Sequence, residues 1–283
     1  MLFSIVHNPL TSASELNQDL KVISTWAYQW KMSFNPDPSK QATEILFTKK
    51  RNIVHHPPLF FNGAQVQRTD EHKHLGLILD PKLTFKNHIA AKTKFSRKNI
   101  GILKQLSLYI PLKTLDQLYK ILVRPHLDYC DIIYHLPPNL NEFDSSLSLN
   151  VSMEMIEKVQ YQAAMAITGT WQGTNRNKLY EELGWESLSE RRWSRRLFQF
   201  FKIQNGLPPC YLTECIPRLR RPLYQNTILN TYHEFRCRTN LFKYSFFPST
   251  VSSWNNLDPV IRSCLSIGSF KQHLIPLIRP KCS

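Results

Sequence analysis

The sequence predicts an α+β protein that is mainly helical, with a few short antiparallel strands confined to residues 1–80. Three observations lead to this fold class. Apolar residues recur at three- and four-residue spacings over most of the chain, which is typical of amphipathic helices. Strand-like alternation and a turn dipeptide occur only between residues 43 and 79. The 283 residues are 42% hydrophobic with only 8 glycines, the composition of a folded protein.

The first predicted element is an amphipathic helix over residues 12–31. Its expected core-facing stripe consists of Leu16, Leu20, Ile23, Ala27 and Trp30. We interpret Trp30 as a packing residue rather than a platform for a ligand. The prolines at 36 and 38 end the helix, because proline does not fit a helix interior. Residues 43–48 then follow as a strand.

Two further features are predicted before residue 80. Asn62-Gly63 favours a β-hairpin, since this dipeptide tolerates the two left-handed residues of a type I′ turn. Residues 74–79 (HLGLIL) predict another strand with Gly76 at its middle. A glycine at such a position often marks the close approach of another backbone or of a ligand.

Residues 84–108 predict a helix with a strongly basic face. Eight Lys or Arg and no Asp or Glu occur between residues 81 and 115. At roughly 100° per residue, a third of the helix circumference carries Lys86, Lys94, Arg97, Lys98 and Lys104. The remaining arc is expected to carry Phe85, Ile89, Phe95, Ile102 and Leu106. Because ordinary surfaces intersperse acids, we favour phosphate contact over a merely solvated face.

More helices are predicted over 112–123, 151–168 and 187–205, with a linker at 137–150. Asp128 and Asp131 can share a helix face, but no third ligand follows nearby. We therefore interpret them as single surface acids rather than as a metal site. Beyond residue 206, weak periodicity predicts short elements that pack onto the helices.

The charge balance indicates a polyanionic partner, whereas no catalytic motif is present. The net charge is +15 and the pI is near 9.6. A generally basic protein without such a partner is the alternative. Phosphate-binding loops, nucleophile elbows and zinc-protease motifs are absent from the sequence, and its 6 cysteines include no CxxC pair. No signal peptide or membrane span is predicted, so we expect an intracellular protein of the nucleus or cytoplasm.

Several sequence blocks follow one another in a distinctive order. The blocks are W-x3-W-x-M-x-FNP from 26, HLGLILDPKLTFKNHI at 74–89, LYKILVRPHLDYC at 118–130, IEKVQYQAAMAITG at 156–169, LYEELGWESLSERR at 179–192, RTNLFKYSFFPSTVSSWNNLD at 238–258 and SFKQHL at 269–274. In this order they resemble the C-terminal half of the reverse transcriptases of non-LTR retrotransposons, of the jockey-like kind. The resemblance covers nearly the whole chain.

The resemblance implies a domain organisation and a truncation. Residues 1–80 match part of the palm, 81–136 a helical thumb, and 151–283 a helical C-terminal region. In the family, a Tyr/Phe-x-Asp-Asp box stands just before the helix at 12–31, and its aspartates help to hold two Mg²⁺ ions. The resemblance therefore implies a polymerase fragment without these aspartates, without a metal of its own and inactive alone.

Individual residues can also be carried over from the family. Lys40 matches the palm lysine that protonates the leaving pyrophosphate, although Pro38-Ser39 looks inserted beside it. Leu75 and Gly76 match the hairpin that grips the primer end. The basic helix falls in the thumb, which implies RNA or an RNA–DNA hybrid as the partner. The alternatives are a module that only binds nucleic acid and a non-functional pseudogene product.

Overall fold

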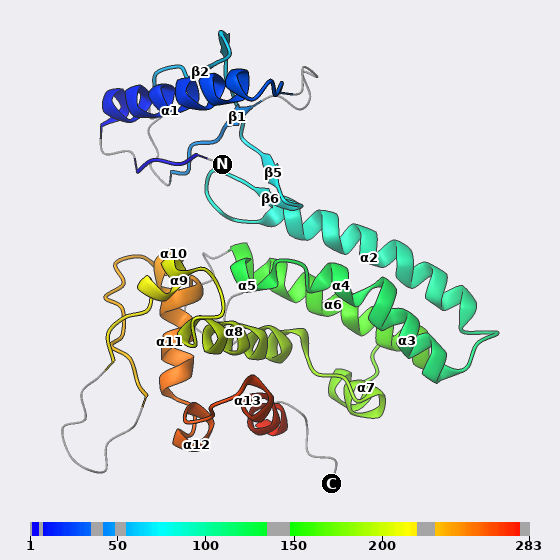
Figure 1. The fold of residues 1–283 in the computed structure, drawn as a ribbon. Helices are drawn as coiled ribbons and strands as arrows, with labels where there is room; N and C mark the ends of the chain where they lie inside the picture. The colour runs from blue at the N-terminus through cyan, green and yellow to red at the C-terminus, as the bar shows by residue number, and fades with distance from the viewer. Residues whose placement is uncertain are drawn as a thin grey trace, which may run out of the picture. The chain divides into compact units, whose positions relative to one another are not determined.

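The computed structural model describes residues 2–5, 8–34, 42–48, 55–134, 148–219 and 230–277, with side chains from residue 153 onward in the range that begins at 148. The chain divides into two compact units, Met1–His88 and Ile89–Ser283, and each is described by itself. The protein is mainly helical with a few short strands, as predicted (Figure 1). No helix in the described ranges is long and apolar enough to cross a bilayer.

The first unit is built around helix α1 (Pro9–Gln29), which confirms the predicted first helix. Asn8 caps it by accepting a hydrogen bond from the Leu10 N–H at 3.0 Å, and Pro9 occupies the first turn, where its missing N–H costs nothing. The Asn17 side chain fastens the β2 segment to α1. Its Oδ1 accepts from the Phe60 N–H at 2.8 Å, and its Nδ2 donates to the Pro58 carbonyl at 3.3 Å.

The predicted core-facing stripe of α1 is only partly buried. Ala27 is buried, and the leucines and isoleucine of the stripe are half-buried. The side chain of Trp30 is 68% exposed, so its interpretation as a packing residue is wrong. The physical reason is a lack of covering partners, because the strand that packs most against α1 in the described part of the unit is the two-residue β2.

The strands of this unit form three short pairs. β2 (Phe60–Phe61) and β3 (Ala64–Gln65) pair antiparallel, as do β5 (His72–His74) and β6 (Leu77–Leu79). β1 (Thr43–Glu44) and β4 (Gln67–Arg68) pair in parallel, so the prediction of antiparallel strands alone is wrong for this pair. Asn62 and Gly63 join β2 to β3 with φ values of 51° and 78°. These are the two left-handed positions of a type I′ turn, so the predicted hairpin is confirmed.

The second unit is helical in its described residues. After α2 (Lys86–Leu106), which begins in the last residues of the first unit, come α3 (Leu112–Leu122), α4 (Arg124–Leu127), α5 (Asp131–Tyr134), α6 (Ser148–Thr168), α7 (Arg176–Leu183), α8 (Leu188–Gln204), α9 (Cys210–Glu214), α10 (Asn240–Lys243), α11 (Phe246–Asn255), α12 (Pro259–Arg262) and α13 (Ile267–Leu274). A 3₁₀ turn, Ile275–Leu277, follows α13. The four long helices predicted from residue 84 to residue 205 are therefore confirmed, with ends that differ by a few residues.

Helix α8 is the centre of the second unit. Ser187 and Glu190 form a capping box at its start. The buried carboxylate of Glu157 on α6 also accepts hydrogen bonds there, from the Leu188 N–H at 3.1 Å and from the Tyr180 hydroxyl at 3.0 Å. These bonds fix the start of α8 between α6 and α7.

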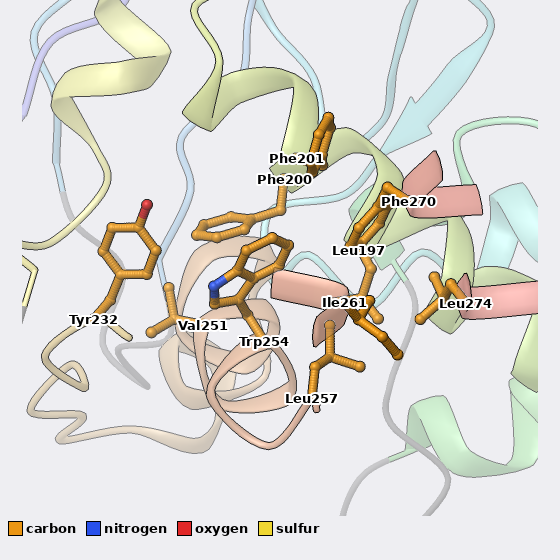
Figure 2. Close-up of a cluster of buried hydrophobic side chains, with 10 residues drawn as sticks. All are labelled: Leu197, Phe200, Phe201, Tyr232, Val251, Trp254, Leu257, Ile261, Phe270 and Leu274. Atoms are coloured by element: carbon orange, nitrogen blue, oxygen red, sulfur yellow. The ribbon is translucent and has the colours of Figure 1, made fainter. Parts of the chain in front are cut away.

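The other side of α8 packs against the C-terminal helices. The cluster drawn in Figure 2 comprises Leu197, Phe200, Phe201, Tyr232, Val251, Trp254, Leu257, Ile261, Phe270 and Leu274. The Trp254 ring lies 5.3 Å from that of Phe200 and 5.6 Å from that of Phe270, and its Nε1–H donates to the Asn230 carbonyl at 2.9 Å. The short elements beyond residue 206 therefore pack onto α8, as predicted.

Candidate nucleic-acid interface

The segment that leads into α2 is organised by one carboxylate. Asp80 accepts hydrogen bonds from the backbone N–H groups of Lys82 at 3.1 Å, Thr84 at 2.9 Å and Phe85 at 2.8 Å. Leu83 and Phe85 have φ values of 52° and 53°, a left-handed region that is unfavourable for side chains of this size. Asp80 therefore holds a strained turn in place before the first turn of α2. This role was not predicted from the sequence, although an aspartate shortly before a helix is a usable signal.

Helix α2 buries a narrow stripe rather than the broad apolar arc that the sequence predicted. Its buried residues after the first turn are Ile89, Thr93, Ser96, Ile100 and Leu103. Phe95 and Ile102 are 48% and 46% exposed, so their assignment to the buried face is wrong. The centre of the buried stripe consists of the small side chains Thr93 and Ser96. Thr93 can be buried because its hydroxyl donates to the Ala90 carbonyl at 3.0 Å.

The segment from α3 to α4 lies beside this helix (Figure 1). The Asn99 amide donates to the Leu122 carbonyl at 2.8 Å, and the Phe95 ring lies 4.4 Å from the ring of His126. Lys92, which lies outside the basic face, has its Nζ 4.2 Å from the centre of the Tyr129 ring. This cation is thus used for packing within the unit.

The basic face of α2 is solvent-exposed at every predicted position. The exposed residues are Lys86, Lys94, Arg97, Lys98 and Lys104. None of these cations forms an ion pair or a side-chain hydrogen bond with another residue that the structure describes. The face adjoins the buried stripe along one side of the helix.

Two of the four arginines of α8, Arg191 and Arg195, behave differently, because buried acids neutralise them. Arg191 Nε lies 2.9 Å from Asp128 Oδ2, and Arg195 Nη1 lies 3.2 Å from both Asp128 Oδ2 and Asp131 Oδ2. Asp128 is 8% exposed and Asp131 is 0% exposed. Their interpretation as surface acids is therefore wrong. Distant residues of α8 bring the compensating charges, which a local reading of the sequence does not reveal.

Burial changes the proton affinity of this cluster. Desolvation raises the pKa of Asp131 to about 6, against the opposing effect of Arg195. The described residues contain no group of three His, Cys, Asp or Glu side chains that could hold a metal ion. Asp128 and Asp131 themselves face arginines, so they do not fit the pair of Mg²⁺ ions that the family resemblance implies.

Leu75 and Gly76 form the tip of a hairpin in the first unit. The structure reverses the chain here, with φ values of 46° and 84°, and His74 pairs with Leu77 across the turn. The prediction of one continuous strand over 74–79 is therefore wrong. The Leu75 side chain is 81% exposed, and a leucine in this left-handed conformation is strained. Lys40, the remaining predicted site residue, lies outside the described residues.

Comparison with known proteins identifies relatives for part of the chain. The chain is 30% identical over 124 residues to the RNA-directed DNA polymerase from mobile element jockey of Drosophila funebris, a match that covers 42% of this chain and 13% of the relative. It is 27% identical over 149 residues to the "Probable RNA-directed DNA polymerase from transposon X-element" of Drosophila melanogaster, a match that covers 52% of this chain and 15% of the relative.

Each match covers only part of this chain and only part of the relative. The chain spans only 13% to 15% of the length of these curated relatives. No protein-family model matches the chain, and no solved structure matches it. Over roughly half of its own length, the chain resembles the RNA-directed DNA polymerases of the jockey and X-element non-LTR mobile elements.

Proposed function

We propose that the chain is a fragment of an RNA-directed DNA polymerase of a mobile element, and that it binds the phosphate backbone of RNA or of an RNA–DNA hybrid. The observation that carries this proposal is the basic face of α2. Its five cations are exposed and have no acidic partner among the described residues. Cations that have no intramolecular partner can each neutralise a phosphate and release its counterions.

The contacts are proposed to be to the backbone rather than to the bases. Lysine provides four of the five cations, and its ammonium group acts as a point charge that recognises phosphate without reading a base pattern. Binding of this kind is independent of sequence, as a polymerase requires of the region that follows its template and product. The chain is proposed to act in the nucleus or the cytoplasm.

The chain is proposed not to copy RNA by itself. Its sequence contains no two adjacent aspartates, and the buried pair Asp128 and Asp131 is neutralised by arginines. Two further assignments belong to the same proposal. Leu75 and Gly76 at the exposed hairpin tip contact the end of the growing strand, and Lys40 serves as the general acid when the rest of the polymerase is present.

The experiment is a binding measurement on the full 283-residue chain with a labelled RNA–DNA hybrid, by fluorescence anisotropy at several salt concentrations. The variant Lys94→Gln/Arg97→Gln/Lys98→Gln removes three adjacent cations of the face. A matched control, Lys113→Gln/Lys158→Gln/Lys178→Gln, removes three exposed cations on other helices and leaves the same net charge.

The α2 variant is expected to bind much more weakly and with a shallower salt dependence. The slope of log K against log salt should fall by roughly 0.7 to 0.9 for each phosphate that the variant no longer neutralises. The control should keep most of the slope. Equal weakening in the two variants would show that net charge alone attracts the nucleic acid, and would contradict an α2 interface.

Two other measurements separate the polymerase fragment from a module that only binds nucleic acid. Preference for the RNA–DNA hybrid and for RNA over duplex DNA of the same length supports the polymerase origin, since the A-form shape is what such a surface follows. Equal affinity for all three supports the simpler module. A primer-extension assay with Mg²⁺ and deoxynucleotides should show no extension by the chain alone.

A further inference from the structure

A polar cavity lies within the second unit, apart from the exposed face of α2. Its volume is about 320 Å³, which is at the lower end of the range for small-molecule sites. Its walls come from α3, from the first residue of α4, from α6, from the connection between α7 and α8, and from the first turn of α8, which carries Arg191. Neither the predicted site residues nor the proposed function involves these walls.

The base of the cavity is rigid. The rings of Tyr119 and Trp185 stack with their centroids 4.1 Å apart, and both side chains are buried. The Tyr119 hydroxyl donates to Gln160 Oε1 at 2.8 Å, and Gln160 Nε2 donates to the Glu186 carbonyl at 2.9 Å. Trp185 Nε1 donates to Asp116 Oδ1 at 2.8 Å. A ligand would therefore meet a surface that is already organised, which lowers the entropic cost of binding.

Three cations line this cavity, and they are compensated unequally. Lys120 Nζ lies 2.6 Å from Asp116 Oδ2. Arg191 is paired with Asp128, and its Nη1 lies 3.9 Å from the carboxylate of Glu186, which also lines the cavity. Arg124 has no carboxylate within ion-pair distance among the residues that the structure describes. Arg124 is half-buried and lines the same cavity as Arg191.

The electrostatic environment of Arg124 favours an added negative charge. Burial, and then repulsion by Arg191, lower the pKa of Arg124 below its ordinary value. Asp128 and Asp116 oppose this lowering only in part, so an anion bound in the cavity would further offset the repulsion. Arginine presents parallel N–H groups that match the oxygens of a phosphate, and two of the three cations in the cavity are arginines.

We propose that this cavity is a phosphate-binding site, in which Arg124 is the principal ligand and Arg191 and Lys120 assist from the adjoining walls. The chemical class is a phosphate monoester or diester. It can be supplied by a nucleic-acid backbone that extends beyond α2 or by a free phosphate-bearing small molecule. The site does not depend on the basic face of α2, because none of that face's residues lines the cavity.

The test is a titration of the full chain with inorganic phosphate, followed by the ³¹P NMR line width at constant ionic strength. Arg124→Gln should weaken phosphate binding by about tenfold or more, because it removes a charge-assisted contact. Lys113→Gln is the matched control, since it removes one exposed positive charge on α3 outside the cavity, and its binding should equal that of the wild type.

Arg124→Gln is expected to fold, because Arg124 forms no ion pair with a carboxylate among the described residues. The thermal unfolding of this variant should stay cooperative. Arg124→Lys provides a second variant, with retained charge and intermediate affinity. The proposal is overturned if the wild type shows no saturable phosphate binding. It is also overturned if Arg124→Gln binds phosphate as well as Lys113→Gln does.

Competition identifies the source of the phosphate. An RNA oligonucleotide that displaces inorganic phosphate, and that binds more weakly to Arg124→Gln, supports a backbone phosphate. Retention of inorganic phosphate at saturating RNA supports a small-molecule ligand. The α2 variant Lys94→Gln/Arg97→Gln/Lys98→Gln should bind inorganic phosphate normally, so failure of the α2 interface and failure of this site are distinguishable.

Discussion

Arg195 and Asp131 form an ion pair inside the second unit, with Arg195 Nη1 3.2 Å from Asp131 Oδ2. The same nitrogen lies 3.2 Å from Asp128 Oδ2, so one arginine of α8 links two acids that flank the start of α5. The Asp131 side chain is completely buried, and it therefore carries the desolvation cost of its charge.

This burial predicts a pH dependence of stability. The pKa of Asp131 rises from 3.8 to about 6 on folding, so the folded state binds this proton more tightly than the unfolded state does. The stabilising contribution is complete below about pH 3.8 and is lost as the pH rises through about 6. Between these values the wild type should lose a few kcal/mol, at most about 3, relative to Asp131→Asn.

Urea denaturation of the two proteins across this pH range measures the effect as a difference in the free energy of unfolding. Asp70→Asn is the control, because Asp70 is exposed and its substitution should leave the pH profile of the wild type unchanged. A wild-type profile that runs parallel to that of Asp131→Asn would mean that the buried carboxyl does not titrate in this range.

The Asp80 carboxylate is predicted to stabilise the entry to α2. Asp80→Ala removes the acceptor for three backbone N–H groups that precede a helix, and it should lower the free energy of unfolding by about 1–2 kcal/mol. Asp80→Asn should lie between alanine and the wild type, because its amide oxygen still accepts. Chemical denaturation followed by circular dichroism gives both values.

Asp70→Ala serves as the matched control for Asp80→Ala, and its stability should stay within about 0.5 kcal/mol of the wild type. Hydrogen exchange locates the effect, since faster exchange is expected in the first turn of α2. Unchanged exchange there would argue against a role for Asp80 in fixing this turn.

A substitution at the hairpin tip is predicted to weaken binding of the nucleic acid without lowering the stability of the protein. Asparagine tolerates the left-handed conformation of residue 75 better than leucine does, so Leu75→Asn should unfold with equal or higher free energy, by up to about 1 kcal/mol. The same variant should bind a hybrid with a recessed primer end more weakly, because it removes an exposed apolar side chain from the tip.

Fluorescence anisotropy with recessed and blunt hybrids measures this difference. Asn62→Gly alters the other hairpin tip with little conformational cost, and its affinity for the recessed end should match that of the wild type. Undiminished binding of the recessed end by Leu75→Asn would remove the hairpin tip from the interface.

Trp254 is predicted to be the most costly single truncation in the C-terminal core. It is fully buried at the centre of the cluster in Figure 2, and Trp254→Ala should destabilise the protein by about 3–5 kcal/mol. Trp254→Phe should be less destabilising, because it keeps a ring but not the hydrogen bond to Asn230. Trp171→Ala is the control, since Trp171 is 87% exposed and its truncation should leave the denaturation midpoint unchanged.

The elements that the sequence predicted well are those defined by neighbouring residues. The Asn62-Gly63 turn depends on the left-handed preference of its own two residues, and it appears where predicted. The positive face of α2 depends on helix geometry and on the absence of nearby acids, and all five of its cations are exposed. Local preference and helical periodicity are sufficient for features of this kind.

The tertiary structure decided which side chains are covered. Trp30 and Phe95 have core-like chemistry, yet both are substantially exposed, although the Phe95 ring contacts that of His126. Asp128 and Asp131 look like surface acids until α8 brings Arg191 and Arg195 beside them, from more than sixty residues later in the chain. The sequence by itself determined the helices and the charge of α2. Only the fold decided burial and ion pairing, because both depend on residues that are distant in the chain and near in space.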